Sequence, residues 1–91
     1  MTGQAFQARY DAQKFYALWP FGATDVEDPN GQRRLQVIRT ALRPGWRVRE
    51  VRDTEVEIEC IVTGPNGEVE EHIFGPYLHA LIIAPLKEVT R

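Results

Sequence analysis

WRVREVRDTEVEIECIVTGPNGEVEEHIF, residues 46–74, is the stretch that decides the fold. In its middle, Val56, Ile58, Cys60 and Val62 occupy every second position, and glutamates fill most of the positions between them. This period of two is typical of a β-strand with one buried face and one solvent-facing face. A helix would scatter the same side chains around its whole circumference, so we predict a strand here.

The residues before this strand predict a second strand that runs antiparallel to it. Pairing positions whose numbers sum to 106 sets apolar side chains against apolar ones and arginines against glutamates. The four pairs are Trp46–Cys60, Val48–Ile58, Arg47–Glu59 and Arg49–Glu57. A slip by one residue would set apolar against charged side chains, so we expect the turn at residues 52–54 to hold this register.

The sequence GPNG at residues 64–67 predicts a tight reversal, because Asn-Gly tolerates the positive φ values that such turns need. A third strand then follows. Its Val69 and Ile73 are predicted to join the apolar face, which places His72 on the outer face. Glu71 shares the parity of the two apolar residues, so either a bulge re-aims it or the strand lies at a sheet edge.

Two helices are predicted before the strands. Residues 4–18 carry large side chains four positions apart, and Pro20 ends this first helix. The second helix covers residues 29–42, with Asp28 as its cap. Gly31 can delay the start of this second helix.

Residues 76–89 leave two interpretations open. A short helix over residues 76–84 is favoured because Pro76 suits a first helical turn, and the alternative is a fourth strand over residues 80–89. The fold class is therefore α+β: two N-terminal helices pack on a three-stranded antiparallel meander, followed by a short C-terminal helix or a fourth strand. With 91 residues, the chain is expected to be a single domain, residues 1–91.

The composition is typical of a folded protein, with 43% apolar and 26% charged residues. No apolar run is long enough to cross a bilayer as a helix. The first residues carry charges where a signal peptide would need a hydrophobic stretch. We therefore expect no membrane association and a cytoplasmic location.

Residues that could carry out catalysis or bind metal are few. Cys60 is the only cysteine and the chain has no serine, which excludes an intrachain disulfide, a cysteine-cluster metal site and a serine nucleophile. Cys60 and His72 are predicted on opposite faces, so they should not act as nucleophile and base. His72 and His79 have no third ligand at a recognisable spacing. We expect no enzymatic activity, no cofactor and no metal.

Charge is strongly segregated along the chain, since residues 33–52 carry a net +6 and residues 53–91 a net −6. The candidate partner-binding residues are glutamates expected on the outer faces of the second and third strands: Glu55, Glu57, Glu59, Glu68 and Glu70. The candidate nucleic-acid-binding residues are arginines assigned to the second helix and one at the turn between the first two strands: Arg33, Arg34, Arg39 and Arg43, and Arg52 at the turn. Such asymmetry can mark a binding surface.

Two hypotheses of function follow from these surfaces. The favoured one is a small non-enzymatic protein that binds another protein, as an adaptor, inhibitor or assembly subunit, and small phage or bacterial regulators fit this size. The alternative is nucleic-acid binding through the arginine-rich segment 33–52. A homodimer is a further hypothesis, formed through the complementary charges or through the free edge of the third strand.

Four aromatic residues crowd together near the end of the first helix: Phe15, Tyr16, Trp19 and Phe21. They could form a ligand pocket or belong to the core. The core is favoured, because aromatic side chains usually supply much of the buried area in a domain this small.

Overall fold

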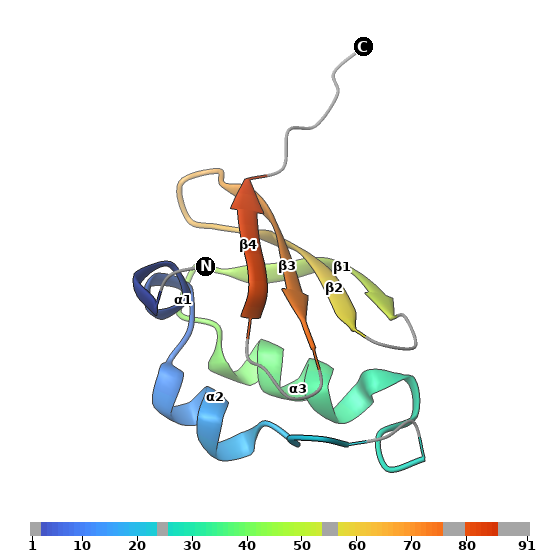
Figure 1. Ribbon diagram of the computed structural model, residues 1–91. Coiled ribbons are helices and arrows are strands. Elements are labelled where there is room, and N and C mark those ends of the chain that lie inside the picture. Colours follow the sequence, from blue (N-terminus) through green and yellow to red (C-terminus); the bar gives the residue numbers. More distant parts are fainter. Residues whose placement is uncertain (1–2, 24–25, 54–56, 76–79, 86–91) are drawn as a thin grey trace.

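The computed structural model describes residues 3–23, 26–53, 57–75 and 80–85, and it has helices on one side and a sheet on the other (Figure 1). The elements, in chain order, are α1 (Gly3–Arg9), α2 (Ala12–Leu18), the short 3-10 helix η1 (Pro29–Gly31), α3 (Gln32–Ala41), β1 (Arg47–Asp53), β2 (Ile58–Thr63), β3 (Val69–Phe74) and β4 (Ala80–Pro85). The strands form an antiparallel meander in the order β1-β2-β3-β4. The predicted α+β class is confirmed.

The helix predicted over residues 4–18 is in fact two helices, which are interrupted at Tyr10. This residue leaves the helix to form an isolated β-bridge with Leu42 at the end of α3. The next residue, Asp11, caps α2 with its side chain, and its backbone N–H donates to the carbonyl oxygen of Ala41 at 2.7 Å. The interruption therefore ties the first turns of the chain to α3, a tertiary contact that helix periodicity does not reveal.

The second helix begins late, as Gly31 suggested. Asn30 and Gly31 both adopt positive φ angles, of 59° and 62°, which separate η1 from α3. The Asp28 carboxylate accepts from the backbone N–H groups of Arg33 and Arg34, at 2.7 and 3.2 Å, so it caps the start of α3. Asp28 thus has the predicted capping role, but the helix that it caps begins about one turn later than expected.

The predicted register between the first two strands is wrong. The paired positions do not sum to 106 as predicted, because Val48 pairs with Val62 and not with Ile58. A bulge follows between Val48 and Glu50, and beyond it Arg52 lies opposite Glu59. The buried parity of β2 is as predicted, since burial alternates along the whole strand. Up to Val48 the register is shifted by four residues, which keeps the same side chains on the same face, so alternation alone could not distinguish the two registers there. Beyond the bulge the shift is five residues, so the parity of β1 reverses.

The faces of β3 are the reverse of the prediction. Phe74 and His72 point inward with the core residues of β2, whereas Glu71 lies on the outer face and needs no bulge. Nor is β3 a free edge, because it pairs with β2 on one side and β4 on the other. Of the two interpretations of residues 76–89, the fourth strand is confirmed and the helix is wrong, since Ala80–Pro85 form β4. Residues 76–79 and 86–89 lie outside the described part of the chain.

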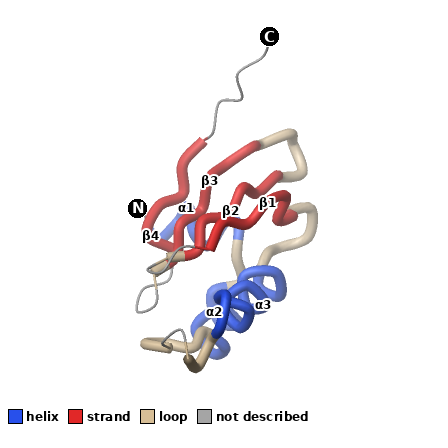
Figure 2. The backbone as a smooth tube through the Cα atoms, turned by 90° about the vertical axis from the view of Figure 1, so that its right-hand side faces the viewer, coloured by secondary structure: helices blue, strands red, loops and turns tan. Residues whose placement is uncertain are grey.

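The core joins the helices to the inner face of the sheet mainly through aromatic rings. Phe15 stacks on Trp19 and on Phe74, with ring centroids 4.8 and 5.5 Å apart. Phe15 and Trp19 are buried as predicted, but Tyr16 and Phe21 are 44% and 51% exposed, so the aromatic cluster is divided between core and surface. Helices α2 and α3 lie on one side of the sheet (Figure 2), and α1 is joined to the inner face through the Arg9–Glu70 pair.

Candidate functional site

The predicted glutamate ribbon does not form one surface. Glu55 lies outside the described residues, and Glu57 is half-buried just before β2. Glu59 lies on the outer face of the sheet, where its carboxylate accepts from the guanidinium of Arg52 at 3.1 Å. Its charge is therefore already partly neutralised by a neighbouring strand.

The two remaining glutamates, Glu68 and Glu70, lie in a turn and in the protein interior. Glu68 accepts from the backbone N–H of Asn66 at 2.8 Å within the turn between β2 and β3. Glu70 is buried on the inner face of β3, opposite Val62. The five predicted partner-binding glutamates are consequently divided among a turn, the residue before β2, the outer face, the inner face and a part of the chain that the structure does not describe.

The five candidate arginines are likewise dispersed. Arg34 is buried and its Nε donates to Asp28 at 2.7 Å, so it is a core residue and not a surface ligand. Arg43 is exposed, but its Nε donates to the carbonyl oxygen of Gln7 at 2.7 Å and holds α1 in place. Because Arg52 pairs with Glu59, Arg33 and Arg39 remain as the members of this set that present exposed side chains on α3.

A buried polar cluster lies between α1 and β3, and the sequence did not suggest it. The Arg9 guanidinium donates two hydrogen bonds to the Glu70 carboxylate, from Nε to Oε1 at 2.8 Å and from Nη2 to Oε2 at 2.5 Å. His72 Nε2 lies 2.8 Å from Glu70 Oε1, and its Nδ1 lies 2.7 Å from the Tyr10 hydroxyl. A carboxylate can only accept, so Nε2–H donates to Glu70 and Nδ1 accepts from Tyr10.

The electrostatics of this cluster fix its protonation states. Burial lowers the pKa of His72, so the imidazole is neutral. The Arg9 guanidinium lowers the pKa of Glu70 despite burial, and burial raises the pKa of Tyr10 well above its ordinary value. The order Glu, His, Tyr resembles a proton relay, but Tyr10 and His72 are fully buried, so the arrangement serves to pin α1 to the sheet. Its only sequence signal is that Glu70 and His72 share the parity of Phe74.

Cys60 and His72 are directly opposite each other on β2 and β3, which corrects the prediction that they lie on opposite faces. Both ring nitrogens of His72 are engaged by Tyr10 and Glu70, so neither is free to act as a base toward the thiol. Burial raises the pKa of Cys60 to about 12. The thiol is therefore an apolar core group at neutral pH.

This burial makes a direct prediction about Cys60. A thiol reagent added to the native protein at pH 7 to 8 should react at the rate of global unfolding, because both the exposure and the thiolate fraction are very low. In denaturant the single thiol should react fully within the mixing time. Rapid stoichiometric labelling under native conditions, measured by absorbance or mass spectrometry, would contradict the burial of this residue.

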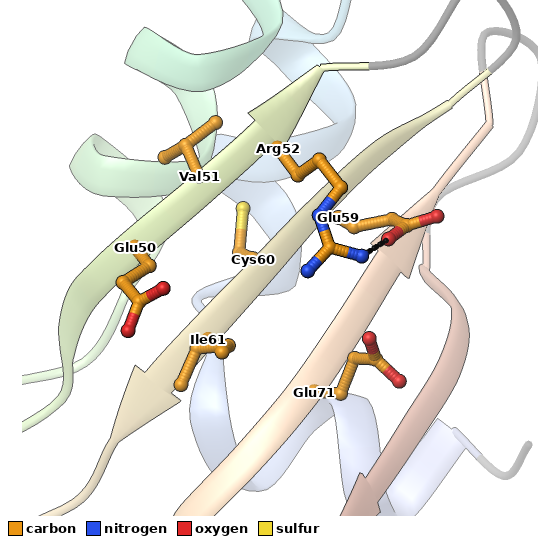
Figure 3. A pocket seen from close by; sticks show the side chains of 7 residues that line it. All are labelled: Glu50, Val51, Arg52, Glu59, Cys60, Ile61 and Glu71. Atoms are coloured by element: carbon orange, nitrogen blue, oxygen red, sulfur yellow. Dashed lines mark hydrogen bonds and ion pairs between the residues drawn. The ribbon is translucent and has the colours of Figure 1, made fainter.

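The outer face of the sheet is the side that no helix of the described chain covers (Figure 2). A hollow of about 100 Å³ lies on it, across β1, β2 and β3. The residues that line it are Glu50, Val51, Arg52, Glu59, Cys60, Ile61 and Glu71. Ile61 pairs with Glu50 on one side and Glu71 on the other, so this apolar side chain sits between two carboxylates (Figure 3).

The outer face continues as an apolar strip beside this hollow. Val69 and Ile73 lie on β3, two residues on either side of Glu71, and both are half-buried. They are diagonal neighbours of Ile61, a separation that long side chains bridge. The face therefore combines partly exposed branched side chains with unshared carboxylate charge, and Glu71 has no hydrogen-bond or ion-pair partner among the described residues.

Within residues 3–23, 26–53, 57–75 and 80–85, no group of three or more histidine, cysteine, aspartate or glutamate side chains could hold a metal ion. The helices of these same ranges are also too short and too polar to cross a membrane. In comparisons with known proteins, no protein-family model, no curated protein and no solved structure matches the chain.

Proposed function

We propose that this is a small non-enzymatic protein that binds another protein through the open face of its sheet, as an adaptor, inhibitor or assembly subunit. The observation that carries the proposal is the row Glu50–Ile61–Glu71, which displays an apolar side chain between two carboxylates on a face without a helix. Partly exposed apolar groups rimmed by charge are typical of protein-binding surfaces. The matching partner surface carries lysine or arginine beside an apolar side chain.

Nucleic-acid binding has weaker support as a function. A binding surface for phosphates needs several arginines free on one side of the molecule. Here Arg34 is buried with Asp28, and Arg52 is paired with Glu59. The outer sheet face, where Glu50 and Glu71 lie, would repel a phosphate backbone.

A capture experiment with an Ile61→Arg variant tests the proposal. The substitution adds a long cation to a half-exposed position, so the fold should persist while the apolar contact with a partner is lost. Tagged wild-type protein should retain a partner protein from nuclease-treated lysate of the source cells. Ile61→Arg should reduce that capture by at least about tenfold, which corresponds to about 1.4 kcal/mol of binding energy.

The matched control is Gln13→Arg, which adds the same charge at an exposed position on α2. It should capture the partner as well as the wild type does. Thermal unfolding of both variants verifies that they are folded. Capture that disappears with nuclease would favour the nucleic-acid alternative, and equal capture by wild type and Ile61→Arg would refute the proposed face.

A further inference from the structure

A second surface lies between the end of α3 and the start of the edge strand β1. The groove there has a volume of about 300 Å³. It is lined by Arg39 of α3, by Leu42 just after α3, by Trp46 just before β1, and by Arg47 and Val48 at the start of β1. It is separate from the hollow on the outer sheet face, with which it shares no lining residue.

The floor of this groove is apolar. Leu42, Trp46 and Val48 are half-buried and pack against the core from its margin. The groove continues along α3 as a second depression that shares Arg39 and includes Leu35, another half-buried apolar residue at the core margin. An occupant could therefore bury apolar side chains against groups that the fold leaves partly exposed.

The arginines of the groove differ from most others in the described chain. Most of the other arginine side chains have protein partners: Arg9 with Glu70, Arg34 with Asp28, Arg43 with the carbonyl of Gln7, Arg49 with Glu50 and Arg52 with Glu59. Among the described residues, Arg39 and Arg47 make no hydrogen bond or ion pair. Two uncompensated cations over an apolar floor are complementary to an acidic, partly apolar ligand.

The backbone adds a third element of recognition. β1 pairs only with β2, so the backbone groups on its other edge have no strand partner in the described sheet. An extended segment can add to such an edge as a new strand, with alternate side chains pointing into the groove. We propose that this groove binds an extended acidic segment of a partner protein by strand addition along the start of β1, at Arg47 and Val48.

Charge and geometry decide against two other occupants. A second copy joined through β1 would bring the arginines of one β1 against those of the other, since Arg47, Arg49 and Arg52 all lie on this strand. Single-stranded nucleic acid binds by stacking bases on free aromatic faces. The Trp46 ring is already covered by the Arg9 guanidinium, 5.2 Å from its centroid, and the ring edge packs close to Gly64.

The test uses a fluorescent twelve-residue peptide in which aspartate alternates with valine and leucine. Fluorescence anisotropy at low salt should show saturable binding to the wild-type protein. The Arg39→Glu/Arg47→Glu double variant should bind at least about tenfold more weakly, because attraction becomes repulsion at two sites. The control Arg33→Glu should change the peptide affinity by no more than about twofold for each unit of charge changed. Arg33 is exposed on α3 but does not line the groove, so its charge acts only at a distance and is screened.

Two further probes separate strand addition and charge recognition from nonspecific attraction. The same peptide with lysine in place of aspartate should not bind. A version that is N-methylated along its central backbone should bind much more weakly, because it keeps every side chain but cannot donate the hydrogen bonds of a strand pair. Equal affinity for the N-methylated peptide, equal loss with Arg33→Glu, or preferential binding of a single-stranded oligonucleotide would overturn the proposal. Ile61→Arg should bind the peptide as the wild type does, because Ile61 does not line the groove. Failure of the proposed sheet-face function can therefore be distinguished from failure of the groove proposal.

Discussion

Replacing Arg34 with methionine should destabilise the domain by about 3–5 kcal/mol, a large part of the 5–15 kcal/mol that typically stabilises a domain of this kind. Arg34 and Asp28 form an ion pair whose side chains are 3% and 0% exposed. Methionine fills much of the same space but leaves the Asp28 carboxylate buried without its cation. Burial alone raises the pKa of Asp28, and hydrogen bonds from Arg34 and from two backbone N–H groups lower it below its ordinary value.

The double variant Asp28→Asn/Arg34→Met isolates the cause of this loss. Asparagine keeps an oxygen that can accept from the backbone N–H of Arg33, so the cap of α3 survives while the buried charge is removed. The double variant should therefore be more stable than Arg34→Met alone, as measured by urea unfolding at pH 7. A double variant that is equal to or less stable than the single one would show that Arg34 acts through packing and not by compensating a buried charge.

Sequence periodicity predicted the parts of the fold that depend on local pattern. The alternation through Ile58 and Val62 identified a strand and its buried face, and Gly31 indicated that the second helix could begin later than Pro29. The register of β1 was not predictable in this way, because registers that differ by an even number of residues bury the same side chains. The bulge between Val48 and Glu50 then changes the parity within the strand.

The face of β3 was mispredicted for a different physical reason. Counting hydrophobic residues favours burial of Val69 and Ile73, whereas burial of Phe74 requires the opposite parity. The parity that buries Phe74 also buries Glu70, and burying this carboxylate is costly unless it is paired with a cation. Its partner, Arg9, is 61 residues away in sequence. No local pattern links these residues, so the buried cluster and the outward-facing Glu71 followed only from tertiary structure.

The candidate sites could be predicted only as groups of like charge. Net charge along the sequence correctly located arginines on α3, but it did not distinguish Arg34, which is buried with Asp28, from Arg39, which lines an open groove. That difference depends on the capping geometry of Asp28 and on the direction of the helix relative to β1. Segregated charge in a sequence therefore identifies where a surface could be, while side-chain pairing determines which charges remain for a partner.

Acidification should destabilise the protein in a pH window that His72 sets. His72 is buried and neutral, and its pKa in the folded chain lies below the ordinary value of 6.5. The unfolded chain then binds more protons than the folded one as the pH falls below about 6.5, so the free energy of unfolding decreases. One such group contributes a slope of at most about 1.4 kcal/mol per pH unit.

The groups around His72 determine how this loss continues. Tyr10 and Glu70 hold its two nitrogens, Cys60 lies opposite on β2, and Arg9 lies beyond Glu70. The pKa of Glu70 is also lowered in the folded state, so its stabilisation is present above its ordinary value of 4.5 and is lost as the pH falls further. Tyr10 and Cys60 remain protonated throughout, since their pKa values are raised.

Urea unfolding of His72→Gln between pH 7 and pH 5 checks this assignment. Glutamine can donate to Glu70 and accept from Tyr10 without titrating, so the variant should be less stable at pH 7 but should lose little further stability down to pH 5. The chain has two histidines, so His79→Gln measures separately what the other histidine contributes to the wild-type slope. If His72→Gln retains that slope, or if His79→Gln removes it, the acid sensitivity does not arise from the buried cluster that joins α1 to β3.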